Sequence, residues 1–236
     1  METMITILRE GSGAANDVAA QGRRIKQLEE QLQQMRTAAV CALNQMLDLK
    51  DLNTGVHSTR LAEWALRVAE QLGVSEQQFH DIEVAAILHD IGKVGVPDAI
   101  LNKPGRLTPE EREVINKHSE YGWAIMRLIP GFQRASLFVL HHHERMDGKG
   151  YPAGLAGEDT PLGARIVAVV DAFDAMVSNR SYRQGLPVEE AMRRLRADSG
   201  TQFDPKIVES FVRLAVQELP EVSQIVEPTL ATQSVP

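Results

Sequence analysis

Helical periodicity runs through nearly all of this 236-residue chain. Apolar residues recur at three- and four-residue spacings, whereas the alternating pattern of a half-buried strand is absent or very short. Glycine and proline separate the helical stretches, and Thr108-Pro109-Glu110-Glu111 is typical of a capped helix start. We expect that helix to run on to about Leu128, with His118 in its middle. The sequence therefore predicts an all-α protein, with one domain of about seven helices over residues 41–220.

A longer helix is predicted ahead of that domain, from Ala19 to Met46. Apolar residues occupy its heptad a and d positions: Ile25, Leu28, Leu32, Met35, Ala39, Ala42 and Met46. The pattern favours a parallel homodimer or an inbound signalling helix, and an amphipathic helix packed on its own domain is the alternative. Residues 1–40 are thus predicted to form a helical extension. No sensor domain fits within it, so we expect a stand-alone enzyme, a fragment of a longer protein, or a dimer. The polar segment 221–236 is predicted to be disordered.

Charge and hydropathy exclude several classes of protein. The chain has 32 acidic and 25 basic side chains, a formal charge of −7, which argues against binding a nucleic-acid polymer through bulk positive charge. No stretch approaches the roughly 18 apolar residues of a membrane span, and the N-terminus lacks the apolar core of a signal peptide. The single cysteine, Cys41, excludes an intrachain disulfide. We therefore expect a cytoplasmic protein that meets any anionic ligand with local cations or metals.

Residues able to bind metal are spread over five of the predicted segments. They are His57, His89 with Asp90, His118, His142 with His143, and Asp171. Neighbouring residues on a helix differ by about 100° in direction, so each adjacent pair can straddle two ions about 3.5–4 Å apart, and Asp90 can bridge them. Nitrogen and oxygen ligands without cysteine suit iron, manganese or zinc. The pattern predicts a two-metal site and phosphoester hydrolysis.

Each candidate also has an ordinary structural interpretation. A single histidine inside a helix, such as His118, is more often a surface or capping residue than a ligand. His80 and His141 have no partner in the scheme. Asp171 is harder to dismiss, because burying an unpaired carboxylate in an apolar helix is costly. For Asp174 we expect a cap or a surface ion pair.

Two motifs resemble a known family. Residues 89–93, HDIGK, resemble the HD signature of metal-dependent phosphohydrolases. Residues 142–152, HHERMDGKGYP, resemble the motif of the HD-GYP subgroup. The likeness extends from residues 48–57 to 200–205, which covers most of the chain. The implied fold is a multi-helix HD-domain bundle behind the N-terminal extension.

The resemblance implies hydrolysis of the bacterial second messenger cyclic di-GMP to pGpG, to GMP, or to both, by a metal-activated hydroxide. The implied metal ligands are His57, His89, Asp90, His118, His142, His143 and Asp171, with Asp90 bridging. The cofactors would be two divalent ions, iron or manganese by preference, with zinc, nickel or cobalt as alternatives. Asn53 stands where three-metal relatives carry a glutamate, and a neutral amide is a poor replacement, so we favour two ions.

The resemblance also implies roles in substrate binding. Lys93 and Asp90 are the implied catalytic residues. Lys93 would stabilise charge at the scissile phosphate. Arg180 and Arg183 would grip phosphate oxygens with their guanidinium groups. Tyr151 would contact the nucleotide or a partner protein at the GYP loop, although a purely structural turn is about equally expected. The alternatives are a cyclic di-GMP receptor or protein-interaction module that uses the GYP loop, and a phosphohydrolase of another nucleotide.

Overall fold

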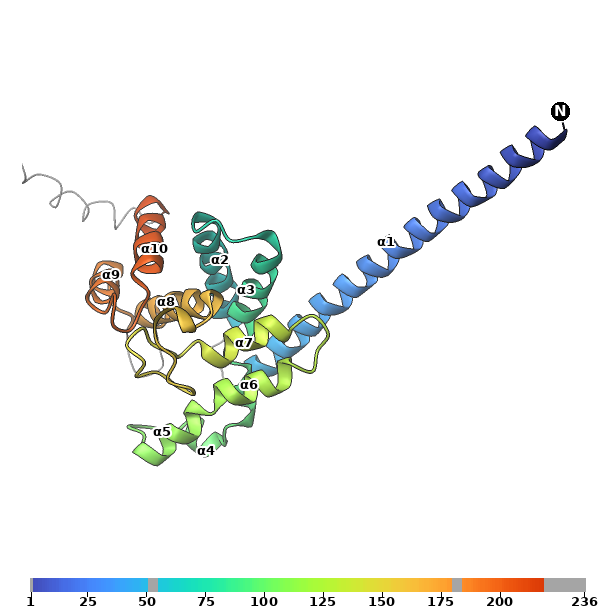
Figure 1. Ribbon diagram of the computed structural model, residues 1–236. Coiled ribbons are helices and arrows are strands. Elements are labelled where there is room, and N and C mark those ends of the chain that lie inside the picture. The colour runs from blue at the N-terminus through green and yellow to red at the C-terminus, as the bar shows by residue number, and fades with distance from the viewer. Residues whose placement is uncertain (1, 51–54, 180–183, 219–236) are drawn as a thin grey trace, which may run out of the picture. The chain divides into compact units, whose positions relative to one another are not determined.

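The computed structural model describes residues 2–50, 55–179 and 184–218, and these are helical with no strand (Figure 1). Two isolated bridges, Asp147 with Ala156 and Ser199 with Phe203, are the pairings of strand type within these ranges. The predicted all-α class is confirmed. The predicted tail falls outside the described residues. None of the described helices combines the length and apolar character needed to cross a membrane.

The chain divides into two compact units, Met1–Ala42 and Leu43–Pro236. The first consists of helix α1 (Glu2–Lys50), which continues into the second. The helix begins well before the expected start at Ala19, because residues 2–18 contain no proline to interrupt it. Six of the seven heptad residues are exposed, among them Ile25 at 57%, Leu28 at 47%, Leu32 at 38%, Met35 at 65% and Met46 at 54%.

Apolar helix faces of the second unit pack around α8. This helix (Leu162–Val177) contacts α2 (Gly55–Gln71), α3 (Glu76–Leu88), α7 (Gln133–His141) and α9 (Val188–Ala197). Its Ile166, Val167, Val169 and Val170 are fully buried, as its apolar sequence requires. Helix α10 (Pro205–Glu218) packs on α2 and α8. The core therefore lies along α8, which carries both Asp171 and Asp174.

A second layer lies against α7 and supplies the remaining site residues. It contains η1 (Ile91–Gly95), α4 (Asp98–Leu101), α5 (Pro109–Asn116) and α6 (His118–Met126), and the short η2 (Gly157–Asp159) precedes α8. Helix α6 packs against both η1 and α7.

The predicted helix from Thr108 to Leu128 is wrong in one respect. Its capping box is present, since Glu111 donates its backbone N–H to the Thr108 hydroxyl and returns its carboxylate to the Thr108 N–H. The helix ends at Asn116, however, and α6 begins at His118 after Lys117. The break coincides with the packing of η1 against α6, a contact between elements that periodicity within one segment does not reveal. His118 therefore starts a helix instead of lying inside one.

Candidate metal centre

Helix ends deliver most of the candidate ligands. His89 and His142 are the C-terminal caps of α3 and α7, Asp90 precedes η1, and His118 opens α6. Gly92 allows these ends to meet, because a Cβ atom at this position would lie 1.8 Å from the His118 carbonyl oxygen. The backbone of η1 thus approaches α6 more closely than any side chain would permit.

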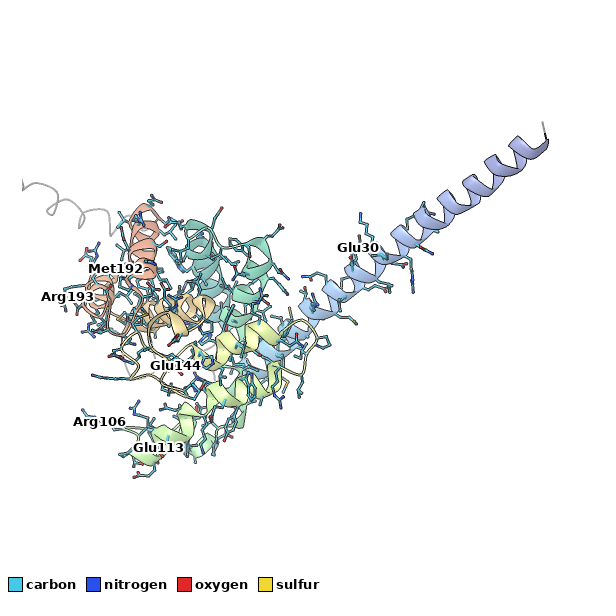
Figure 2. All side chains as sticks on the ribbon, viewed as in Figure 1. Glu30, Arg106, Glu113, Glu144, Met192 and Arg193 are labelled. Atoms are coloured by element: carbon cyan, nitrogen blue, oxygen red, sulfur yellow. The ribbon has the colours of Figure 1, made fainter. Side chains whose placement is uncertain are left out.

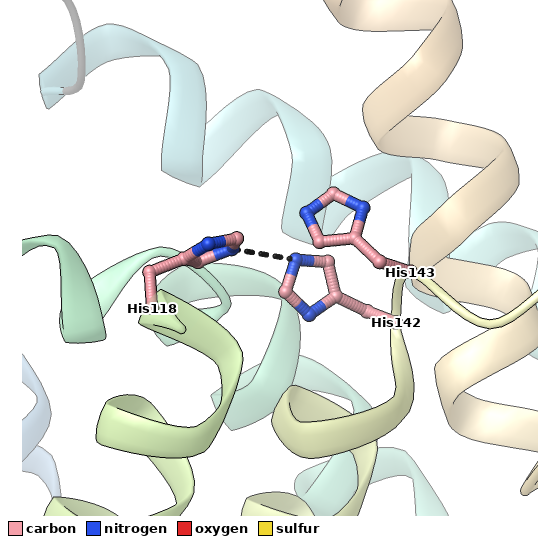
Figure 3. Close-up of side chains that lie close together, drawn as sticks. All are labelled: His118, His142 and His143. Carbon is pink, nitrogen blue, oxygen red and sulfur yellow. Dashed lines mark hydrogen bonds between the residues drawn. The ribbon is translucent and has the colours of Figure 1, made fainter. Parts of the chain in front are cut away.

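Six candidate ligands come together at this point. His89 Nε2 lies 3.4 Å from Asp90 Oδ2 and 3.6 Å from Asp171 Oδ1, while His118 Nε2 lies 3.5 Å from Asp90 Oδ1. The imidazoles of His118, His142 and His143 point toward one another, with one ligand atom of each within 4.8 Å of the others (Figure 3). The convergence brings nitrogen and carboxylate oxygen donors from α3, η1, α6, α7 and α8 to one place.

Three of these imidazoles are oriented in the same way. In each, Nδ1 lies within hydrogen-bonding distance of the backbone carbonyl three residues earlier, so that an Nδ1–H donates and the lone pair stays on Nε2. The pairs are His89 with Ala86 at 2.9 Å, His118 with Ile115 at 2.8 Å and His142 with Val139 at 2.7 Å. The backbone therefore presents three Nε2 donors to the centre.

Burial keeps several of these imidazoles neutral. It lowers the pKa of His142 well below its ordinary value, with help from the neighbouring His143 and His118. Burial likewise lowers the pKa of His143 to about 4 and also depresses the pKa of His118. A neutral imidazole is the form that binds a metal, so these side chains suit a cation at neutral pH.

The two carboxylates, Asp90 and Asp171, are held in their charged form. Burial disfavours ionisation of Asp90, but Lys93 and His89 outweigh it and hold the Asp90 pKa well below its usual value. Asp171 also has a lowered pKa, because the hydrogen bond and charge of His89 exceed the effect of burial. His89 in turn has a pKa well above its ordinary value, since Asp90 and Asp171 overcome burial. Both carboxylates are therefore in the ionised form that binds a cation.

Comparison with known proteins places this geometry in a family. The family model described as "HD domain" matches residues 41–207 of this chain. The chain belongs to the HD-domain family. Membership of this family implies divalent-metal binding, and the inward Nε2 atoms, neutral imidazoles and buried carboxylates fit such ions. The predicted resemblance to the HD-GYP type is confirmed.

Curated relatives include two with informative names. The chain is 45% identical over 174 residues to "Cyclic di-GMP phosphodiesterase" of Thermotoga maritima, which covers 73% of this chain and 47% of the relative. It is 40% identical over 168 residues to "3'3'-cGAMP-specific phosphodiesterase 2" of Vibrio cholerae, which covers 69% of this chain and 32% of the relative. The chain thus spans less than half the length of either protein.

Solved structures agree on the fold. A V. cholerae cyclic GMP-AMP specific phosphodiesterase superposes with a TM-score of 0.60 at 24% identity, over 78% of this chain and 49% of that one. At this identity the likeness concerns the helical arrangement alone, which matches the predicted HD-domain bundle.

The seventh predicted ligand, His57, contacts a different acidic residue of α8. It lies in the first turn of α2, its side chain is 27% exposed, and its Nδ1 contacts Asp174 Oδ2. The prediction that Asp174 forms a cap or a surface pair is wrong: Asp174 is 1% exposed and also binds Arg60. The sequence contained a feature that indicates this burial. Asp174 follows Asp171 by three residues, so the two share one face of an apolar helix.

Lys93 and Tyr151 border the HD-domain centre. Lys93 Nζ lies 2.8 Å from Asp90 Oδ2, which places its ammonium group beside the carboxylates. The Tyr151 ring lies 4.8 Å from the His143 ring, and burial raises the pKa of Tyr151 well above its ordinary value, reinforced by Asp90 and Asp171. Tyr151 is therefore a neutral phenol at the edge of the site.

Glu144 has a structural role that sequence reasoning missed. The residue is labelled in Figure 2 and follows the two histidines at the end of α7. Its buried carboxylate accepts the backbone N–H of Ala153 at 2.7 Å and of Leu155 at 3.0 Å. Gly150 passes so close that an added Cβ would lie 2.5 Å from the Glu144 Cα. Glu144 thus holds the loop that carries Tyr151, whose bond to Pro152 is cis.

Three predicted residues lie outside the described residues: Arg180, Arg183 and Asn53. The other two histidines lie beside glutamates. His141 Nδ1 is 3.5 Å from Glu144, and His80 Nδ1 is 3.7 Å from Glu83. Neither contact joins a histidine to the six converging donors.

Proposed function

We propose that this chain hydrolyses cyclic di-GMP to pGpG, to GMP, or to both. The observation that carries the proposal is the convergence of four imidazoles and two carboxylates, three of the imidazoles with backbone-tethered Nδ1 atoms. The 45% identity to the T. maritima cyclic di-GMP phosphodiesterase supports the choice of substrate.

The proposed cofactors are two divalent ions, iron or manganese. Their ligands would be His57, His89, Asp90, His118, His142, His143 and Asp171. Bridging by Asp90 is supported by its two oxygens, since Oδ2 lies near His89 and Oδ1 lies near His118. When bound, the ions would polarise a phosphoryl oxygen and activate water for in-line attack. Nitrogen and oxygen donors without cysteine suit iron, manganese or zinc, and the resemblance to the HD-GYP type favours iron or manganese.

Cations and an aromatic ring would bind the substrate. The Lys93 ammonium group beside Asp90 is close enough to the carboxylates to reach a phosphate bound there and to stabilise its developing charge. Arg180 and Arg183 are proposed, from sequence alone, to bind the phosphates with their forked guanidinium groups. The Tyr151 phenol beside His143 would contact a nucleotide at the lip of the site.

Anaerobic loading with iron or manganese, followed by metal analysis and product chromatography, tests the proposal. We expect two ions per chain and linear pGpG from cyclic di-GMP. Asp90→Ala should abolish turnover while circular dichroism shows an intact helical fold. Turnover at the native rate by Asp90→Ala protein free of contaminating phosphodiesterase would refute the proposal, whereas tight binding without hydrolysis would identify a receptor.

A second substrate has support from the comparisons. The V. cholerae relative named as specific for 3'3'-cGAMP is 40% identical to this chain. Initial rates with cyclic di-GMP and 3'3'-cGAMP, measured at equal concentrations on the same metal-loaded preparation, separate the two candidates. We expect cyclic di-GMP to be the faster substrate.

We also propose a parallel homodimer through the N-terminal helix and a cytoplasmic location. The exposed apolar residues Ile25, Leu28, Leu32 and Met35 support the dimer, because they follow the heptad spacing of a two-helix seam. The cytoplasm is where a bacterial second messenger is available. Light scattering at increasing concentration tests the dimer, and a monomer at high concentration would exclude it. A partner protein at the GYP loop stays a prediction.

A further inference from the structure

Asp174 is a buried carboxylate whose two oxygens are both engaged. One oxygen, Oδ2, contacts His57 Nδ1, and the other, Oδ1, accepts a hydrogen bond from Arg60 Nε at 2.6 Å. Arg60 Nη2 also donates to the Ser178 hydroxyl at 2.8 Å. His57 and Arg60 are one turn apart on α2, Asp174 lies in the last turn of α8, and Ser178 is the C-terminal cap of α8. The four residues form a clamp between these two helices.

His57 is held by a side chain from another helix. The other tethered histidines use the carbonyl three residues earlier in their own local backbone. His57 lies in the first turn of α2. Its Nδ1 contacts Asp174 Oδ2, and Asp174 belongs to α8.

Arg60 makes the buried Asp174 tolerable. A carboxylate at 1% exposure is costly unless a counter-charge and hydrogen bonds satisfy it. The guanidinium group does both and keeps contact with water, since the Arg60 side chain is 44% exposed. The pair thus places a fixed negative charge behind the His57 ring.

The geometry points to Asp174, supported by Arg60, as the positioning residue that orients His57 toward the metal centre. The carboxylate holds the proton on Nδ1 and leaves the lone pair on Nε2, as carboxylates behind metal-bound histidines do. The inference rests on the proposed function, because it takes His57 to be a metal ligand. Asp174 itself touches neither metal nor substrate.

Metal affinity, measured by chelator competition without substrate, tests the role. Asp174→Asn should weaken binding of one ion by about 10- to 100-fold. Asp204→Asn is the matched control, because Asp204 is also a buried aspartate paired with an arginine, Arg165, and neither residue is a proposed ligand. We expect that control to lower the melting temperature while both ions bind with native affinity.

A double-mutant cycle separates positioning from general loosening of the fold. Once His57→Ala has removed the imidazole, adding Asp174→Asn should lower metal affinity no further. Additive losses, or native affinity in Asp174→Asn, would overturn the inference. Metal affinity is measured separately from turnover. A chain that binds two ions but leaves cyclic di-GMP intact would refute the proposed function. The same double-mutant cycle would still test the role of Asp174 in such a chain.

Arg60→Met provides a second variant if Asp174→Asn fails to fold. It removes the counter-charge and retains much of the apolar stem. Its control is Arg134→Met, since Arg134 is 47% exposed and also pairs with an aspartate, Asp81. We expect Arg60→Met to weaken binding of one ion several-fold and Arg134→Met to leave it unchanged. Equal affinities in the two variants would contradict the supporting role of Arg60.

Discussion

Four of the proposed histidine ligands are held in two different ways. On the side built by α3, α6 and α7, backbone carbonyls tether His89, His118 and His142. On the side built by α2 and α8, the Asp174 side chain holds His57. Backbone tethers come with the helix ends themselves, so they form whenever the local fold forms. The side-chain tether depends on two helices meeting and on a buried charge being neutralised, and single substitutions can alter it without breaking a helix.

Loss of a backbone-tethered imidazole should have the largest effect. His118→Gln removes an Nε2 donor that faces both Asp90 and His142. We expect hydrolysis to fall by about 10³-fold or more, together with the metal content. His80→Gln is the control, because His80 is a histidine beside Glu83. Equal activity in the two variants would remove His118 from the ligand set.

Gly92→Ala should disrupt the packing of η1 against α6, on the side of the centre where backbone carbonyls hold the histidines. The added Cβ would meet the His118 carbonyl oxygen at 1.8 Å, so η1 and α6 must move apart. We expect a loss of about 3 kcal/mol in the free energy of unfolding, measured with urea, and weaker metal binding. Gly22→Ala, where a Cβ meets nothing within 4 Å, should leave stability unchanged or raise it by up to about 1 kcal/mol. Native stability in Gly92→Ala would show that this close approach is not needed.

Glu144→Gln should disturb the loop that carries Tyr151 and leave metal binding unchanged. The amide nitrogen would replace one of the oxygens that accept the Ala153 and Leu155 N–H groups, leaving a buried donor unpaired. We expect a loss of about 1–3 kcal/mol in stability. The KM for cyclic di-GMP should rise while the metal content stays at the native value. Loss of metal together with substrate affinity would instead place Glu144 in the support of the histidines.

Ser178→Ala should have the smallest effect and tests the side-chain tether at its edge. It removes the hydrogen bond that Arg60 donates to the hydroxyl and the one, at 3.5 Å, that the hydroxyl donates to Asp174 Oδ2. The bond from Arg60 to Asp174 stays in place. The expected loss is about 0.5–1.5 kcal/mol in stability, with metal affinity within a few-fold of native. A loss of affinity as large as that of Asp174→Asn would show that the hydroxyl, and not the charge pair, holds His57.

Several errors of sequence interpretation share one cause. The helix predicted to run through His118 ends at Asn116, and the surface pair predicted for Asp174 is a buried contact with His57 and Arg60. Glu144 was part of the motif but had no predicted role. In each case the deciding contact joins elements that are distant in the sequence or belong to different layers, and periodicity within a segment carries no information about such partners.

The sequence by itself determined the helical class, the capping box of α5 and the set of donor types, because these follow from local periodicity, local hydrogen bonding and side-chain chemistry. The tertiary structure decided which donors converge and how each is held. Gly92 against His118, Glu144 against the loop after Tyr151, and Asp174 between His57 and Arg60 are contacts between separate elements. Their strength depends on burial and close approach, which exist only after the helices have packed.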